Sequence, residues 1–241
     1  MPACDRALPW LTRDQMDLDL PVGIIKQLDV AFAPESYDPE GYSGGDRSGG
    51  RSSSSLSNTT WHAILAGGAG LQPDVFFNDA ATQSSILAEM QKIGGYTAYR
   101  RIGSILRESG GIVGFKQDGD RFRRTTLINS VDTTNPGTSA VTATLHVPLL
   151  DGILARIAVG GHNVTTNGVY ILVTALDETD TTPTIALNTI ASPAATIWNN
   201  VEKEVKVNSS AQIRYRFSIS GASDRIVINS LGWNDTRGRN S

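Results

Sequence analysis

The chain has 241 residues and a formal net charge of −3, a balance that argues against a protein held on nucleic acid by bulk positive charge. Its single cysteine, Cys4, leaves no internal disulfide to form and fits assembly in a reducing cytoplasm. No stretch of about 18 or more apolar residues is present, so we expect no membrane insertion, and residues 1–19 lack the pattern of a secretory signal.

Residues 1–33 are predicted to form an extended N-terminal arm. Apolar side chains recur along it, but so short a segment cannot bury them by itself, so the main domain or a partner must cover them. We therefore predict that the arm anchors the protein to a partner. The predicted anchoring residues are Trp10, Leu11, Ile24, Ile25 and Phe32.

The composition changes abruptly at residues 34–58, where Pro, Gly, Ser, Tyr and Asp dominate. Such a stretch cannot bury enough apolar surface to offset the entropy that is lost on ordering. It is therefore predicted to be a flexible linker rich in Gly and Ser. The alternative is a segment that becomes ordered on a neighbouring subunit.

Residues 59–241 are predicted to form one folded β domain. In its first half, strand patterns accompany a single stretch with helical spacing, and Gly-Gly or Asp-Gly pairs mark the turns. The expected strands are 59–65, 73–77, 96–106, 112–116 and 122–129, and the expected helix is 81–92.

The second half of this domain reads as a series of strands separated by Gly, Asn, Asp, Thr and Pro turns. Alternation is clearest at Ile213–Ile219, where apolar residues take one face and Arg214 and Arg216 take the other. The expected strands are 141–147, 153–159 with Arg156 outward, 169–176, 198–207, 213–219 and 225–233. We therefore predict a mainly β fold: an antiparallel, jelly-roll-like β-sandwich with one short helix, preceded by the extended arm.

No pattern in the sequence predicts a catalytic, cofactor-binding or metal-binding site. The three histidines, His62, His146 and His162, have neither a helical ligand spacing nor a cysteine partner and are interpreted as surface residues. The Asp177–Asp180 loop lacks the spacing of a calcium loop, which favours a solvated turn. No serine lies in a nucleophile elbow. We therefore do not expect an enzyme.

Basic residues are the one concentrated feature of the chain. Arg100-Arg101 and Arg121–Arg124 could lie on adjacent strands of one sheet, with Arg121 and Arg123 on one face and Arg124 on the other. Arginines interleaved with aromatic residues could stack on sugars or bases. The alternative is that they pair with acidic residues of neighbouring strands or subunits. In an acidic chain we expect no nucleic-acid partner.

One run is more specific than the rest. It reads Gly-Tyr-Thr-Ala-Tyr-Arg-Arg-Ile-Gly-Ser-Ile at Gly95–Ile105, and a Phe-Lys-Gln-Asp-Gly-Asp-Arg-Phe hairpin follows at Phe115–Phe122. This pattern resembles a domain that is common in virion proteins of tailed bacteriophages, such as tail fibres and collar (neck) fibres. The resemblance covers roughly Ser57–Arg124 and leaves out the arm and the linker.

The resemblance implies a structural component of a bacteriophage virion, assembled in the host cytoplasm and docked through the arm on portal, neck, tail or capsid proteins. It also implies a homo-oligomer, often a trimer, and no known catalytic residues. Two alternatives stay open: a fibre module that binds a host surface glycan, and a capsid decoration or head-fibre protein. The motif residues expected to serve the fold and subunit contacts are Tyr96, Tyr99, Arg100, Arg101 and Ile102.

Overall fold

The computed structural model describes residues 57–68, 74–92, 96–163, 168–192 and 197–237. The predicted arm and almost all of the predicted linker lie outside the described residues. The described residues group into two compact units, where the sequence predicted one domain over 59–241. Unit 1 runs to Val113 and includes the C-terminal end from Thr236, and unit 2 covers Gly114–Asp235.

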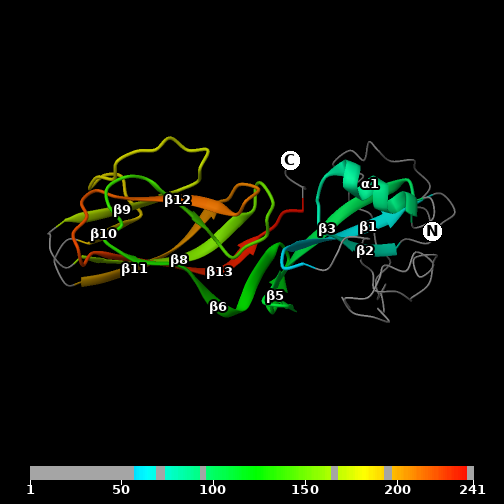
Figure 1. Ribbon diagram of the computed structural model, residues 1–241, viewed down its shortest axis with the longest axis horizontal. Coiled ribbons are helices and arrows are strands. Elements are labelled where there is room, and N and C mark those ends of the chain that lie inside the picture. Colours follow the sequence, from blue (N-terminus) through cyan, green and yellow to red (C-terminus); the bar gives the residue numbers. More distant parts are fainter. Residues whose placement is uncertain (1–56, 69–73, 93–95, 164–167, 193–196, 238–241) are drawn as a thin grey trace. The chain divides into compact units, whose positions relative to one another are not determined.

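Unit 1 is a small antiparallel sheet with one helix beside it, in the strand order β2-β1-β3-β4 (Figure 1). Apolar side chains from the first two strands, from the helix and from the segment before β3 meet in its core. The elements are β1 (Thr60–Gly67), β2 (Asp74–Asn78), α1 (Gln83–Lys92), β3 (Ala98–Glu108) and β4 (Gly111–Ile112). The core residues are Ile64, Ala66, Phe76, Ile86, Met90 and Tyr96.

The inner strand β1 is buried on both faces, which corrects one prediction of the sequence. His62 was interpreted as a surface residue, yet only 2% of it is exposed. Because side chains alternate along a strand, His62 shares a face with Ile64, which packs in the core that α1 completes. The helix therefore covers the face on which His62 lies. The sequence of β1 by itself does not predict that a helix packs on this face.

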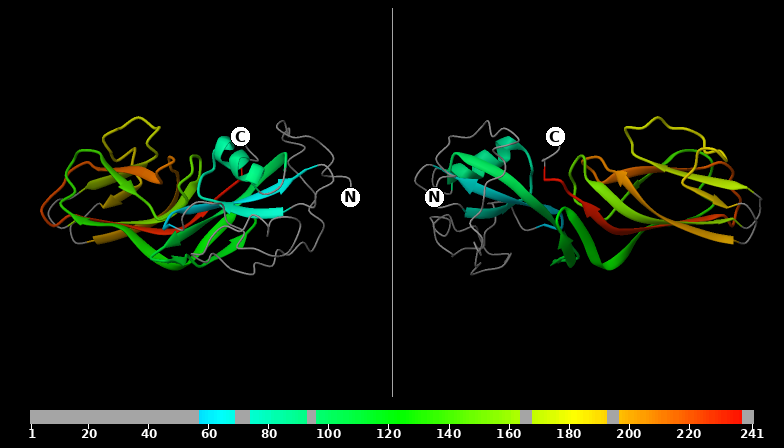
Figure 2. Two further views of the ribbon diagram at one scale, coloured as in Figure 1. Left: turned by 45° about the vertical axis from the view of Figure 1, so that its right-hand side comes forward. Right: turned by 180° about the vertical axis from the view of Figure 1, so that it is seen from behind.

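Unit 2 is an antiparallel β-sandwich whose two layers are visible in Figures 1 and 2. The larger sheet has the order β11-β8-β13-β6-β5 and the smaller sheet has the order β10-β9-β12-β7. The strands are β5 (Phe115–Asp118), β6 (Arg121–Thr134), β7 (Val141–Thr144), β8 (Leu154–Asn163), β9 (Val169–Thr174), β10 (Ile190–Ser192), β11 (Ile197–Lys206), β12 (Gln212–Phe217) and β13 (Arg225–Asn234).

The predicted fold class is therefore confirmed: mainly β, antiparallel, sandwich-forming, with one short helix. No helix among the described residues is long and apolar enough to cross a membrane.

Alternating side chains build the interior of the sandwich. In β12, Ile213, Tyr215 and Phe217 are buried, and the arginines between them lie on the other face, as the sequence predicted. Ile219, which was predicted to face inward with them, lies beyond the end of β12 and is 44% exposed, because the chain leaves the sheet after Phe217. In the larger sheet, Phe122 and Trp233 stack with ring centroids 5.3 Å apart and an interplanar angle of 6°. Because these rings come from β6 and β13, the stack holds those neighbouring strands together on the inner side of the sheet.

Candidate functional site

The predicted motif residues lie on or just before β3, in unit 1. Tyr96 is buried in the core, and Tyr99 packs against that core, where burial raises the pKa of its hydroxyl. Arg100, Arg101 and Ile102 are each half-buried. The two tyrosines therefore have a role inside the unit, and the predicted subunit contact of the motif stays a prediction.

A bulge gives the Arg100-Arg101 pair its setting. Arg101 pairs with Ile64 while Gly103 pairs with Ala63, so Ile102 is an extra residue on β3. The bulge brings Arg101 and Ser104 to one face although they are three residues apart. The Nη1 group of Arg101 donates to Ser104 Oγ at 2.9 Å.

The same hydroxyl meets a histidine. His62 Nδ1 and Ser104 Oγ are 2.8 Å apart and share a hydrogen bond on the paired strands β1 and β3. A serine beside a histidine is a pattern of nucleophilic catalysis. Here, however, only 1% of Ser104 and 2% of His62 are exposed, so a substrate has no access to the hydroxyl. The contact satisfies buried polar groups within unit 1.

The predicted anchoring residues of the arm, Trp10, Leu11, Ile24, Ile25 and Phe32, lie outside the described residues. The two basic runs, which the sequence allowed to lie on adjacent strands of one sheet, belong to different sheets. Arg100 and Arg101 belong to the sheet of unit 1, whereas Arg121–Arg124 belong to β6 in unit 2. A single sequence does not show which distant strands pair with one another. The sequence therefore could not predict that the two basic runs lie in different sheets.

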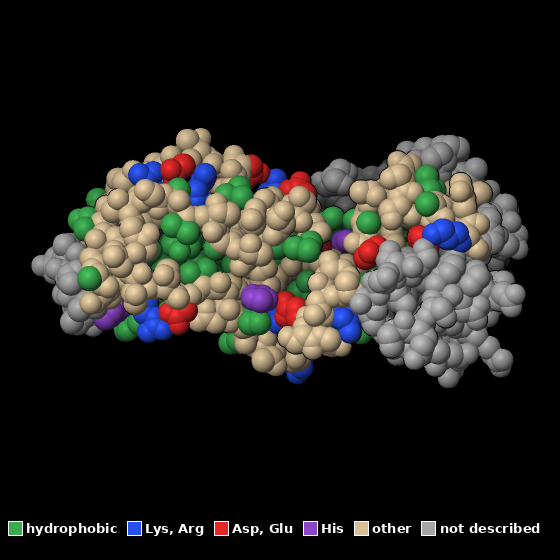
Figure 3. All heavy atoms as spheres, viewed as in Figure 1, with side chains coloured by type: hydrophobic (Ala, Val, Ile, Leu, Met, Phe, Trp, Pro, Cys, Tyr) green, Lys and Arg blue, Asp and Glu red, His purple; other side chains and the backbone are tan. Residues whose placement is uncertain are grey.

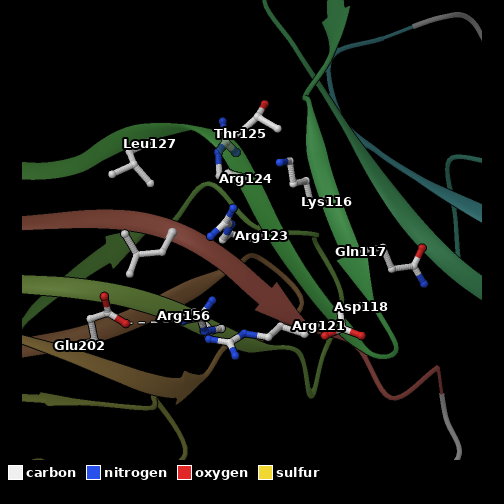
Figure 4. A pocket seen from close by; sticks show the side chains of 11 residues that line it. Lys116, Gln117, Asp118, Arg121, Arg123, Arg124, Thr125, Leu127, Arg156 and Glu202 are labelled. Carbon is white, nitrogen blue, oxygen red and sulfur yellow. Dashed lines mark hydrogen bonds and ion pairs between the residues drawn. The ribbon is translucent and has the colours of Figure 1, made fainter.

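The basic run of unit 2 lines a hollow on the outer face of the larger sheet, with a volume of about 750 Å³ (Figure 4). Strand pairing places one row of residues across all five strands of the sheet. That row is Lys116 on β5, Arg123 on β6, Gly232 on β13, Arg156 on β8 and Glu204 on β11. Arg121 lies two residues from Arg123 on the same face.

Gly232 occupies the middle of this row, and its backbone requires glycine. Its φ is +155°, a conformation that residues with side chains rarely adopt, and it lies at a bulge of β13 beside Leu231. A Cβ atom at this position would overlap the carbonyl oxygen of Phe122 and lie 3.0 Å from Arg123 Cα. The row thus has no side chain between Arg123 and Arg156, and Leu231 beside the glycine lines the hollow.

Cationic side chains dominate the lining of the hollow. Five of them, Lys116, Arg121, Arg123, Arg124 and Arg156, face two carboxylates, Asp118 and Glu202. Figure 4 shows Arg121 and Arg123 projecting from β6 toward the side of the hollow where Arg156 lies.

The five cations differ in what holds them. Arg124 lies on the opposite face of β6 from Arg121 and Arg123, as predicted, is buried and donates to the carbonyl oxygen of His146 at 3.0 Å. Arg156 takes the predicted outer face but is only 9% exposed, lying 3.5 Å from Glu202 and 3.7 Å from Glu204. Lys116, Arg121 and Arg123 are exposed and make no ion pair or side-chain hydrogen bond with any described residue.

Elsewhere in unit 2, cations have close carboxylate partners. Arg225 forms two hydrogen bonds with Asp132 at 2.6 and 2.5 Å, and these hold the pKa of Asp132 below its ordinary value. In the Asp177–Asp180 loop, Asp180 receives a hydrogen bond from Arg216 at 2.8 Å, and Asp177 pairs with Lys206 at the same distance. This loop is therefore a set of ion pairs with neighbouring strands.

A second feature of the outer face is an aromatic pair that the sequence did not predict. Trp198 stacks on His162 with centroids 4.9 Å apart, and the guanidinium of Arg225 lies 5.9 Å from the Trp198 centroid. Strand pairing sets these three residues in one row across β11, β8 and β13. Trp198 remains 43% exposed, so one amphipathic ring is open to a partner.

The rest of the described surface is less concentrated. Figure 3 shows apolar side chains in small separate groups on the visible face of unit 2, with charged side chains nearer its margins. Within the described ranges, no three His, Cys, Asp or Glu side chains gather in a way that could hold a metal ion.

Comparison with known proteins identifies no family for this chain. No family model matches the chain, and no curated protein is similar to it. A structure of infectious bursal disease virus, Gx strain, is 14% identical with a TM-score of 0.24 and covers 79% of this chain and 56% of its own. A structure of the Gt strain is 12% identical with a TM-score of 0.20 and covers 76% of this chain and 53% of its own. The chain thus spans little more than half of these viral proteins, and likeness at these scores does not bear on function.

Proposed function

We propose that the chain is a structural protein of a tailed-bacteriophage particle: a fibre-type appendage of the tail or collar. One observation supports the proposal best. The stretch that resembles such appendage domains, roughly Ser57–Arg124, takes in the described residues of unit 1 up to Val113, and these have their own sheet, helix and core. A segment that folds around its own core is what a shared building block requires.

The roles of the motif residues agree with this proposal. Tyr96 fills the core, Tyr99 packs against it, and Arg101 bonds across a bulge to Ser104. These are roles in holding a fold together. The hairpin that completes the resemblance, β5 with β6, belongs to unit 2, so the resembling stretch crosses the boundary between the units.

The proposal assigns docking to the arm, residues 1–33, on a portal, neck, tail or capsid protein. It assigns assembly to copies of the chain, as a homotrimer with one arginine of the Arg100-Arg101 pair at the subunit boundary. Light scattering coupled to size exclusion of the full chain should give the mass of a trimer. A stable monomer at micromolar concentration would contradict the trimer.

Particle composition tests the proposed function. Full-length protein and a variant without residues 1–33 are each supplied during infection by a phage that lacks its own copy of the gene. Purified particles are then analysed by mass spectrometry. We expect the full chain in the particles and the variant only in the soluble fraction, with the circular dichroism of a folded β protein.

Absence of the full chain from purified particles would refute the proposal, and equal incorporation of the variant would refute arm docking alone. Electron microscopy of labelled particles then separates a tail, neck or capsid position.

A second candidate function, binding of a host surface glycan, is favoured by the exposed ring of Trp198 stacked on His162. Aromatic rings with a polar edge are suited to partly wet binding surfaces. A glycan array probed with the full chain and with Trp198→Ala tests it. Binding that Trp198→Ala abolishes supports the role, and an array without any binding contradicts it.

A further inference from the structure

We propose that the hollow on the larger sheet binds an oxyanion: a phosphate, sulfate or carboxylate group. This inference goes beyond the proposed function and does not depend on it. The hollow is built wholly from strands β5, β6, β8, β11 and β13 of unit 2.

The first argument is the charge that the hollow leaves uncompensated. Lys116, Arg121 and Arg123 lie on two paired strands and have no ion-pair partner among the described residues. Like charges on neighbouring strands repel and reduce stability. The chain as a whole is acidic, with a net charge of −3, so the concentration of unpaired cations is local.

The second argument is the contrast with the remainder of unit 2. Arg225, on β13 but outside the hollow, and Arg216, on β12, each have a carboxylate within 2.8 Å. These two cations are thus matched to acidic partners, unlike those of the hollow. The unmatched set lies beside Gly232, the position without a side chain between Arg123 and Arg156 in the paired row.

The third argument is geometry. A guanidinium presents a planar fork of donors that fits two oxygens of a carboxylate, sulfate or phosphate. Arg156 is held at the base of the hollow by backbone pairing and by its contacts with Glu202 and Glu204, which are long and involve carboxylates 70% and 50% exposed. Such pairs are weak. An incoming oxyanion can therefore share Arg156 with them.

The lining also narrows the class of ligand. Phe122 and Trp233, in this part of the sheet, are 2% and 0% exposed, and the half-buried Phe115 packs against both of them. No ring is thus offered in the hollow on which a nucleic-acid base could stack. The volume, about 750 Å³, exceeds that of a lone ion and leaves room for the group that carries the oxyanion.

Calorimetric titration tests the proposal. The full chain is titrated with sodium sulfate and with sodium phosphate, and with sodium chloride at matched ionic strength as reference. Arg121→Gln/Arg123→Gln should weaken oxyanion binding at least tenfold, and Arg121→Lys/Arg123→Lys should weaken it less, because charge is kept but the fork is lost. Both positions are exposed, so thermal melts of these variants should show no loss of stability relative to the native protein, and the Gln variant should melt at the same or a higher temperature because it has less charge repulsion.

The matched control is Arg216→Gln, which removes one positive charge from the smaller sheet and should leave oxyanion affinity unchanged. The proposal would be overturned if titration with chloride released as much heat as titration with sulfate. It would also be overturned if the double Gln variant bound the oxyanions as tightly as the native protein.

The titration is repeated with two larger ligands that carry carboxylate groups, a uronate-bearing oligosaccharide and an oligoglutamate peptide. Tighter binding of either one, lost in the double variant, identifies the carrier of the oxyanion. Binding of the free ions alone supports a small-anion site, and binding of none of the probes overturns it.

Discussion

Gly232→Ala is the sharpest test of how the hollow is built. The methyl group would overlap the backbone carbonyl of Phe122, and neither strand can yield without losing the pairing of Gly232 with Arg123. The φ of +155° belongs to a region that is essentially restricted to glycine, which costs about 1–3 kcal/mol for other residues. Overlap in a packed region costs a further 1–3 kcal/mol, roughly. We therefore expect a loss of about 2–6 kcal/mol in the free energy of unfolding.

The matched control is Gly152→Ala. Gly152 has a φ of +80°, but a Cβ atom there would meet nothing within 4 Å, so only the backbone cost of about 1–2 kcal/mol remains. Urea denaturation of both variants, followed by circular dichroism and tryptophan fluorescence, measures the difference. Because the chain has two units, only the transition that reports on unit 2 should shift. A Gly232→Ala loss no larger than that of Gly152→Ala would refute the steric argument.

Three further predictions concern stability. Phe217→Ala removes a fully buried ring and should cost about 3–5 kcal/mol in urea unfolding, whereas Ile219→Ala, at a 44% exposed position, should cost less than about 1 kcal/mol. Ser104→Ala removes a buried hydroxyl between two partners and should cost about 1–3 kcal/mol; native-like stability would contradict its structural role. The hydrogen bond from Arg225 holds the pKa of Asp132 below its ordinary value of 3.8, so this stabilisation is complete above the unfolded-state pKa and is lost as the pH falls through the folded-state pKa. The difference in melting temperature between the native protein and Asp132→Asn should therefore shrink below about pH 4, and a constant difference down to about pH 2 would argue against it.

The elements that could be predicted from the sequence are those with one buried face. In β12, apolar residues at every second position are buried, because a strand in a sandwich has one face on the core. The helix α1 followed from Ile86 and Met90, which lie one turn apart and both pack in the core. The β5–β6 hairpin followed from its Asp118-Gly119 turn, where Gly119 has a φ of +56°.

The parts that could not be predicted depend on contacts far apart in the sequence. Nothing in the composition marks the boundary at Val113, because strands of similar spacing lie on both sides of it. The hollow joins Arg123 to Arg156 through β13, near the C-terminus, and only the paired register shows that these residues share a row. The bulge at Ile102 could not be predicted from the sequence either, because it arises from the pairing of β3 with β1.

The packing on the inner face of the larger sheet determines which side chains lie on its outer face. On the inner face, the stack of Phe122 on Trp233 holds β6 against β13. Because side chains alternate along a strand and Phe122 faces inward, Arg121 and Arg123 on either side of it both face outward, although their charges repel each other. The glycine at the β13 bulge lets the backbone of β13 approach that of β6 beside Arg123, where a Cβ atom would collide with the Phe122 carbonyl oxygen. Apolar packing inside the sandwich thus supplies the stability that keeps like charges together on its surface, and an oxyanion bound there would relieve the repulsion among them.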